Sequence, residues 1–321
     1  MKQLIIGGCI AAACCWAQAA AGQAYPSKPV RFIVPWSAGS GTDLMARAFA
    51  QELTKALGQQ VVVDNRGGAG AMIGTEVAAR SAPDGYTIYI GGSVSMSTSP
   101  ALYPKVGYDP VKDFAPVSLV SRFFNALSVH PSVPVRSVKE LVAFARARPG
   151  ELLMGSAGNG STSHLAGELF KQLAKVNLLH VPYKSGGQLV VGVVSGESHL
   201  SFSPVSTALT HMKTGKLRTL GVSSTHRLTA LPDLPVIAET VPGYEFGGWQ
   251  AIFAPAGTPQ EIVARLHAGT VKAISAQEFK DYLFREGSDL VGSTPAELAK
   301  FLRADVEKNR NLIRSAGIKL Q

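Results

Sequence analysis

VRFIVPWSAGSGTD, residues 30–43, is an apolar run that ends at a proline and continues into small, flexible residues. The pattern predicts a strand, a tight turn and the start of a helix, in that order. Glycines let the backbone approach a ligand closely, and a helix N-terminus presents unpaired N–H groups and partial positive charge. The stretch is therefore predicted to hold an anion without help from Lys or Arg.

A second turn of this kind, GSAGNGSTSH at 155–164, follows a predicted strand at 152–154 and precedes a predicted helix at 165–174. Strand and helix patterns alternate along the chain, which predicts α/β architecture with largely parallel sheets. Two strand–turn–helix units suggest two similar lobes. Extended segments are expected at 114–120 and 126–129, and helices at 261–274, 278–285 and 295–314. Ser137 and Thr294 are expected to cap helices.

The composition of the 321 residues, with 46% hydrophobic and 17% charged, is typical of a compact globular protein with a sizeable core. The net charge is +9, but no dense Lys/Arg block or basic–aromatic platform accompanies it, so nucleic acid is not an expected partner. The diffuse positive charge would attract small anions or would serve solubility alone.

Residues 1–24 are predicted to be a signal peptide, with basic Lys2, an apolar run at 4–16 and small residues up to Ala24. Cleavage after Ala24 would leave an exported mature protein. Cys9, Cys14 and Cys15, the three cysteines of the chain, would be removed, leaving no disulfide, thiolate nucleophile or Cys metal site. A lipid anchor on Cys9 is an alternative, although the apolar region before it is very short.

Neither glycine-rich turn has the lysine of a phosphate loop. Gly68, Gly70 and Gly74 imitate a dinucleotide fingerprint, but the third glycine comes one place late. The seven histidines show no metal-ligand spacing. No cofactor and no metal are therefore expected.

Hydrolase chemistry has little support, because the sequence has no Gly-x-Ser-x-Gly elbow. His164 lies beside several hydroxyl residues, and a Ser/His/Asp grouping with Asp43 can be imagined. We interpret His164 instead as a first-turn helix residue near the ligand. Asp43 is expected to stabilise its helix start or to hold the shape of its turn. Tyr183 would form either a wall of the site or part of the core.

Short sequence blocks distributed over the mature chain carry a family resemblance. They are YPSKPV (25–30), VPWSAGSGTD (34–43), VDNRGGAG (63–70), PDGYT (83–87), DPVKDFAPV (109–117), GSAGNGS (155–161), HVPYK (180–184), GKLR (215–218), LPDLP (231–235) and APAGTP (254–259). In this order they resemble the Bug family, the periplasmic solute-binding proteins of tripartite tricarboxylate transporters.

The resemblance implies a Venus-flytrap protein, two-lobed and type II-like, with mixed, mostly parallel sheets flanked by helices. Lobe 1 would comprise residues 25–122 and 226–321, and lobe 2 residues 123–225. The hinge would lie near 121–125 and after Ser223. Carried over by position, the ligand-binding residues would be Trp36, Ser37, Ala38, Gly39, Gly41, Thr42, Asp43, Ser93, Gly158, Asn159, Gly160, Ser161, Thr162, His164, Tyr183 and Ser203.

The implied function is not enzymatic. A monomer would capture a small organic anion, a mono-, di- or tricarboxylate that is aliphatic or aromatic, and deliver it to membrane transporter subunits. Ser203 stands where family members often have an aspartate, which disfavours amino acids, and Gln188-Leu189 replaces a usual proline-alanine. Two alternatives are a binding protein for a signalling receptor and a secreted hydrolase that uses His164.

Overall fold

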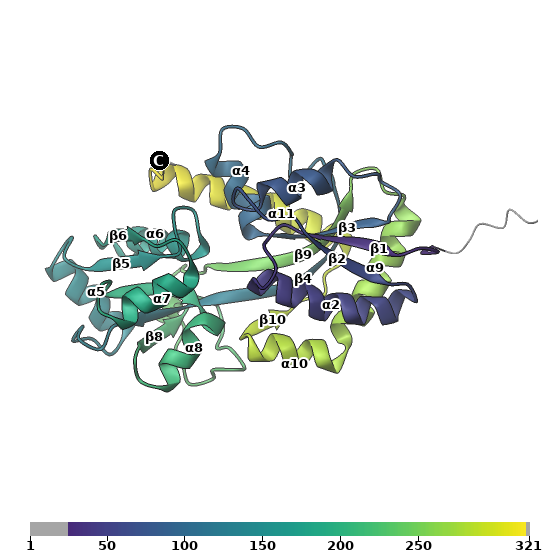
Figure 1. Cartoon of the computed structure of the whole chain (residues 1–321). Coiled ribbons are helices and arrows are strands. Elements are labelled where there is room, and N and C mark those ends of the chain that lie inside the picture. Colours follow the sequence, from purple (N-terminus) through teal and green to yellow (C-terminus); the bar gives the residue numbers. More distant parts are fainter. Residues whose placement is uncertain (1–24, 319–321) are drawn as a thin grey trace, which may run out of the picture.

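The computed structural model describes residues 25–318, so the predicted signal peptide lies outside the described part. Two α/β lobes are placed end to end (Figure 1). In chain order the elements are β1 (Val30–Val34), α2 (Gly41–Leu57), β2 (Val61–Asn65), α3 (Met72–Ala79), β3 (Thr87–Gly92), η2 (Val94–Thr98), α4 (Ser99–Leu102), β4 (Phe114–Val129), α5 (Val138–Ala147), β5 (Leu153–Ser156), α6 (Thr162–Ala174), β6 (Leu179–Pro182), α7 (Gly186–Val194), β7 (Leu200–Pro204), α8 (Val205–Lys213), β8 (Arg218–Val222), η3 (Ile237–Glu239), β9 (Gly247–Pro255), α9 (Gln260–Ser275), α10 (Gln277–Arg285), β10 (Ser288–Leu290) and α11 (Pro295–Ser315).

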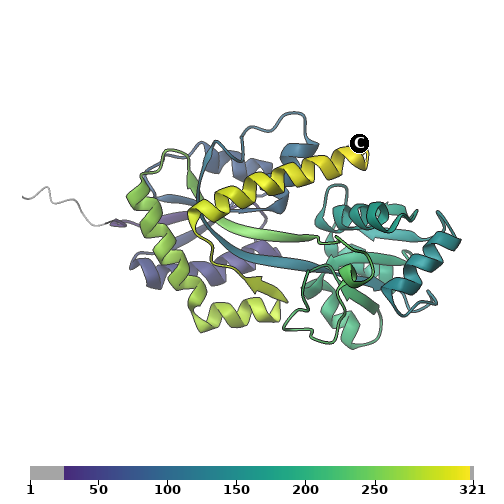
Figure 2. The ribbon, with the colours of Figure 1, turned by 180° about the vertical axis from the view of Figure 1, so that it is seen from behind.

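The sheet of lobe 1 has the strand order β2-β1-β3-β9-β4, and β10 also pairs with β4. β1 is parallel to β2 and β3, whereas β9 is antiparallel to β3 and β4. Successive side chains of β1 point to opposite faces. Phe32 and Val34 pack with α2 and α9, and Ile33 packs with α11. Helices therefore cover both faces of this sheet, as the reverse view in Figure 2 shows.

The sheet of lobe 2 contains β5 and β6, β7, β8 and the second half of β4. β5 is parallel to β6 and β7, and β4 is antiparallel to β7 and β8. Leu141 of α5 and Phe170 of α6 pack against Phe202 on one face. On the other face α8 contributes Val205, and Leu189 of α7 lies in an adjoining cluster.

β4 is one strand of 16 residues that both sheets share. Phe114–Phe124 pairs with β9 and Asn125–Val129 pairs with β7. Ala126–Val129 also pairs with β8. The sequence predicted two separate extended segments here, at 114–120 and 126–129. That division is wrong, since backbone pairing continues through 121–125 and Arg122 forms an ion pair with Glu245 at 2.6 Å.

Three segments that connect the lobes are joined at Ser223, where the hinge is predicted. The Asn125 amide donates to Ser223 Oγ at 2.8 Å, and the Ser223 amide donates to the Asn125 carbonyl at 2.9 Å. The Ser223 hydroxyl in turn donates to the Phe246 carbonyl. One buried serine, directly after β8, therefore links the middle of β4 to the residue before β9.

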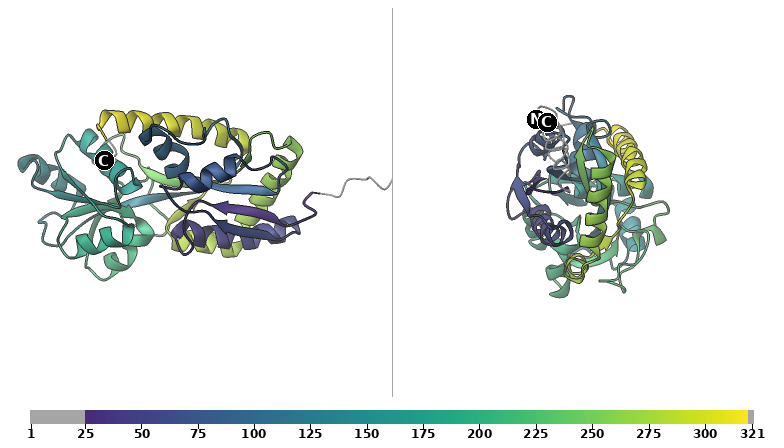
Figure 3. Two further views of the ribbon diagram at one scale, coloured as in Figure 1. Left: turned by 45° about the horizontal axis from the view of Figure 1, so that its top comes forward. Right: turned by 90° about the vertical axis from the view of Figure 1, so that its right-hand side faces the viewer.

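Two segments that the sequence assigns to lobe 1 contribute to the core of lobe 2. Leu312 and Ile313 at the end of α11 belong to that core, as do Ile237 and Tyr244 before β9. Figure 3 shows α11 running along one side of both lobes. The lobe boundaries at 122/123 and 225/226 stay a prediction, and the packing of residues 237–246 and of α11 crosses them.

Two predicted helix caps are confirmed. Ser137 Oγ accepts from the Glu140 amide, and Thr294 Oγ1 accepts from the Glu297 amide at 3.3 Å. Pro295 occupies the first turn of its helix, where no intrahelical N–H bond is lost.

Candidate ligand-binding site

The turn at 37–43 is held together by the buried carboxylate of Asp43. Ser40 caps α2 by accepting a hydrogen bond from the Asp43 amide at 3.2 Å. The carboxylate accepts from the Gly39 amide at 2.8 Å, from Asn65 Nδ2 at 2.9 Å and from Arg47 Nε at 3.0 Å. Only 1% of Asp43 is exposed. Its oxygens therefore face the protein and fix the shape of the turn.

Burial raises the pKa of Asp43, but the hydrogen bonds from Arg47, Gly39 and Asn65 outweigh it. The net result is a pKa below the usual 3.8, so the carboxylate is charged at neutral pH. Gly39 has a φ of +81°, a left-handed conformation that favours glycine and directs its N–H to Asp43.

The turn at 158–164 is built around His164. Ser161 caps α6 by accepting from the His164 amide at 3.3 Å, and its hydroxyl donates to the Gly158 carbonyl at 2.7 Å. His164 Nδ1 accepts from the Gly160 amide at 3.1 Å, which places the ring proton on Nε2. The ring stacks on His180, with centroids 3.8 Å apart.

Both imidazoles are neutral at pH 7. Burial, with the charge of Lys171 as a smaller cause, lowers the pKa of His164 to about 4. Burial also lowers the pKa of His180 to about 4, assisted by His164 and Lys171 and opposed by Glu168. Because Nδ1 of His164 is occupied by a backbone N–H, it is not placed to act as a base toward a neighbouring serine.

A cavity of about 400 Å³ lies between the lobes. Its lining residues come from both lobes: Trp36, Ser40, Gly41, Thr42, Met45, Phe123, Ala157, Thr162, Ser163, Gly186, Pro204, Val205, Ser206, Gln250, Tyr282, Leu283, Glu286 and Ser288. Of the described residues 25–318, no Lys, Arg or His is part of this lining.

The first residues of four helices line this cavity. They are Gly41 and Thr42 of α2, Thr162 and Ser163 of α6, Gly186 of α7, and Val205 and Ser206 of α8. Each helix start presents N–H groups without intrahelical partners and a partial positive charge. The cavity is thus suited to an anion although no cationic side chain lines it.

Hydroxyl groups at the same helix starts are positioned by neighbours. Thr42 Oγ1 accepts from Gln250 Nε2 at 3.2 Å, which leaves the Thr42 proton free to be donated. Ser163 Oγ accepts from the Ala157 amide at 2.9 Å. Gln250 lies on β9, far from Thr42 in sequence, so sequence spacing offered no signal for it.

Of the residues predicted to bind ligand, Trp36, Gly41, Thr42 and Thr162 line the cavity. The other turn residues lie outside its lining: Ser37, Ala38, Gly39 and Asp43 in the first turn, and Gly158, Asn159, Gly160, Ser161 and His164 in the second. Several of them instead supply the hydrogen bonds that shape the turns.

Three further predicted residues lie outside this lining. Ser93 is buried where η2 begins. The Tyr183 hydroxyl pairs with Ser198 Oγ at 2.9 Å. Ser203 pairs with Ser201 Oγ at 3.1 Å and is 1% exposed, while the next residue, Pro204, reaches the cavity.

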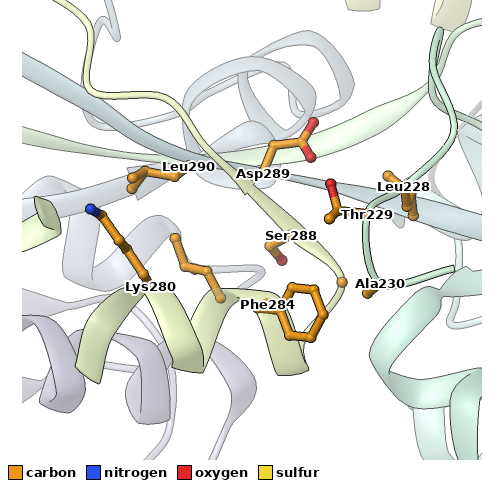
Figure 4. A pocket seen from close by; sticks show the side chains of 10 residues that line it. Leu228, Thr229, Ala230, Lys280, Phe284, Ser288, Asp289 and Leu290 are labelled. Atoms are coloured by element: carbon orange, nitrogen blue, oxygen red, sulfur yellow. The ribbon is translucent and has the colours of Figure 1, made fainter. Parts of the chain in front are cut away.

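A second cavity, of about 340 Å³, lies beside the first. As Figure 4 shows, α10 contributes Lys280 and Phe284, β10 contributes Ser288, and a facing loop contributes Thr229 and Ala230. No helix of residues 25–318 begins at this lining, which includes the C-terminal turn of α10 instead. It therefore lacks the feature that suits the first cavity to an anion.

The fold and the cavity define a two-lobed solute-binding protein. The chain matches the family described as "Tripartite tricarboxylate transporter family receptor" over residues 45–318. It therefore belongs to this family, which confirms the resemblance to Bug proteins.

Relatives match over most of their length. A Pseudomonas sp. (strain P51) protein encoded in the tcbD-tcbE intergenic region is 37% identical over 90% of this chain and 87% of its own. Protein BugT of Bordetella pertussis is 34% identical over 92% of both chains.

Solved structures agree with these relatives. A protein of R. palustris solved with adipate is 35% identical, with a TM-score of 0.81 over 92% of this chain and 99% of its own. Periplasmic binding protein BugD is 32% identical, with a TM-score of 0.77 over 92% and 100%. MatC from Rhodopseudomonas palustris with bound malate is 29% identical, with a TM-score of 0.76 over 90% and 100%.

Proposed function

We propose that this protein captures a small organic carboxylate in the cavity between its lobes and delivers it to a tripartite tricarboxylate-type membrane transporter. It acts in the periplasm as a monomer, after removal of residues 1–24, and returns the ligand chemically unchanged. The observation that carries this proposal is the convergence of four helix N-termini on one cavity that no cationic side chain of residues 25–318 lines.

The adipate and malate bound by two related proteins support a carboxylate as the ligand class. Backbone N–H groups and hydroxyls such as Thr42 would hold the carboxylate, and apolar side chains such as Trp36 and Phe123 would contact its carbon chain. The lobes would close on the ligand about the segments that meet at Ser223.

Thermal unfolding with a panel of aliphatic and aromatic mono-, di- and tricarboxylates tests the proposal. At least one acid should raise Tm in proportion to the logarithm of its concentration, and its primary amide should not. Mass spectrometry after incubation should recover the acid unchanged. An amide that stabilises the protein as well as its acid, or turnover of any acid, would contradict the proposal.

A further inference from the structure

Gln250 is held at the cavity by the strand on which it lies. β9 is paired on both sides, with Gly92 of β3 and Ser121 of β4 opposite Gln250. Because side chains alternate along a strand, Gln250 lies on the same face as Ile252, which packs in one core cluster with Phe49 of α2. Gln250 therefore lies on the side of the sheet that α2 covers, and it lines the cavity.

The carboxamide of Gln250 bonds to a hydroxyl group at each of its two ends. Its Nε2 donates to Thr42 Oγ1 at 3.2 Å, and its Oε1 accepts from the Ser121 hydroxyl at 3.4 Å. Ser121 is buried, whereas Gln250 and Thr42 are half-buried and both line the cavity. These bonds connect the sheet to the first turn of α2.

The orientation of this carboxamide determines what Thr42 offers to a ligand. An amide N–H can only donate, so the Thr42 oxygen accepts and its hydroxyl proton is free for another partner. The reversed carboxamide would accept that proton through Oε1, and Thr42 would then offer a lone pair instead. A carboxylate only accepts hydrogen bonds, so it stabilises the first orientation.

Two backbone N–H groups lie beside the Thr42 hydroxyl. At the start of α2, Ser40 Oγ accepts from the Asp43 amide and the Ser40 carbonyl accepts from the Leu44 amide. The first-turn amides that remain are those of Gly41 and Thr42, and both residues line the cavity. Since no cationic side chain of residues 25–318 lines it, neutral donors such as these have to bind the charge of an anion.

We propose that Gln250 is a positioning residue for the ligand: by bonding to Thr42 Oγ1, it keeps the Thr42 proton directed to the ligand carboxylate. This inference rests on the proposed function, because it assumes that the α2 start holds a carboxylate. The effect of Gln250 on affinity passes through Thr42.

A double-mutant cycle followed by calorimetry tests the inference. The probe is the acid that binds wild type most tightly among adipate, malate, citrate, hexanoate and benzoate. Thr42→Val keeps the side-chain shape without the hydroxyl and should weaken binding about tenfold, and Gln250→Met keeps the length without the amide and should weaken it about fivefold. In the Thr42→Val background, Gln250→Met should change affinity less than about twofold, because the group on which it acts is absent.

Thr42→Ser distinguishes positioning from a structural role, because it keeps the hydroxyl. In that background Gln250→Met should again weaken binding about fivefold. Gln250→Glu should weaken it about tenfold more than Gln250→Met, since the new carboxylate accepts the Thr42 proton and repels the acid. Gln51→Glu is the matched control, because it adds the same charge at an exposed position of α2 outside the cavity lining, and it should leave affinity unchanged.

Two results would overturn the inference and leave the proposed function standing. One is an equal loss on Gln250→Met in the wild-type and Thr42→Val backgrounds, and the other is wild-type affinity in Thr42→Val. Failure of every carboxylate in the broader panel to bind would overturn both the inference and the proposed function.

Discussion

The turns at 37–43 and 158–164 share one pattern of hydrogen bonds but use different anchoring side chains. In each, a serine caps the following helix, and its amide donates to the residue three places earlier at 3.2 Å. In each, the helix residue three places after the cap accepts a glycine N–H, through a carboxylate in Asp43 and an imidazole in His164. In both turns an inward-facing side chain accepts a glycine N–H, and the comparison shows that this acceptor need not be charged.

The difference in anchors also changes the electrostatics of the two lobes. Asp43 is charged and bonded to Arg47, whereas His164 is neutral and lies 3.7 Å from Glu168, which Lys171 contacts at 2.7 Å. Neither anchor lines the cavity. Both turns can therefore present N–H groups to an anion, because the charged Asp43 and the neutral His164 both lie outside the cavity lining.

Removing the anchors should have the largest effect, and it should be unequal. Asp43→Ala would leave donors from Gly39, Asn65 and Arg47 without their acceptor, so we expect a loss of about 4 kcal/mol in the free energy of unfolding. His164→Ala would leave only the Gly160 N–H without its acceptor, so the free energy of unfolding should fall by about 2 kcal/mol. Urea denaturation at pH 7.5 measures both. Equal losses would contradict the view that the Asp43 turn depends on a charged network.

Acid should weaken the second turn before the first. The folded-state pKa of His164 and His180 is about 4, below the usual 6.5, so the unfolded chain binds more protons between these values. Stability is present above pH 6.5 and is lost as pH falls toward 4, by about 3 kcal/mol for each of the two histidines. Asp43, whose pKa is lowered below 3.8, contributes its loss only at more acidic pH.

Denaturant titrations at pH 7.5, 6, 5 and 4 give this profile. A free energy of unfolding that is constant down to pH 4 would show that the two histidines do not titrate in this way.

His164→Asn should have a smaller effect on stability than His164→Ala, and it tests whether the two turns need the same kind of acceptor. The amide oxygen of asparagine can accept the Gly160 N–H, just as the Asp43 carboxylate accepts the Gly39 N–H. The free energy of unfolding at pH 7.5 should therefore fall by about 1 kcal/mol. Because one titrating ring is removed, the stability loss between pH 6.5 and 4 should also become smaller than in wild type. A cost equal to that of His164→Ala would mean that packing against His180, rather than the acceptor, holds the turn.

Local patterns in the sequence predicted the lobes' main elements and the two helix starts, because caps and apolar periodicity are set by neighbouring residues. They did not predict that Phe123, Gln250 and Glu286 line the cavity. These residues lie on β4, on β9 and at the end of α10, and only the pairing of β4 with β9 and the packing of α10 bring them together. Ser203 shows a finer limit. Because side chains alternate along β7, Ser203 lies on the same face as Ser201 and bonds to it. The next residue, Pro204, lines the cavity.

The affinity of Gly41→Val tests the central claim most directly, namely that the helix starts hold a carboxylate. No atom lies within 4 Å of a Cβ added at Gly41, so valine fits there, while its side chain would occupy the cavity at the start of α2. Gly187→Val, beside the lining residue Gly186 but outside the lining, is the matched control. With the acid that stabilises wild type most, calorimetry should show at least a hundredfold loss for Gly41→Val at unchanged Tm of the free protein, and little change for the control. Unchanged affinity in Gly41→Val would remove the α2 start from the site and contradict the account.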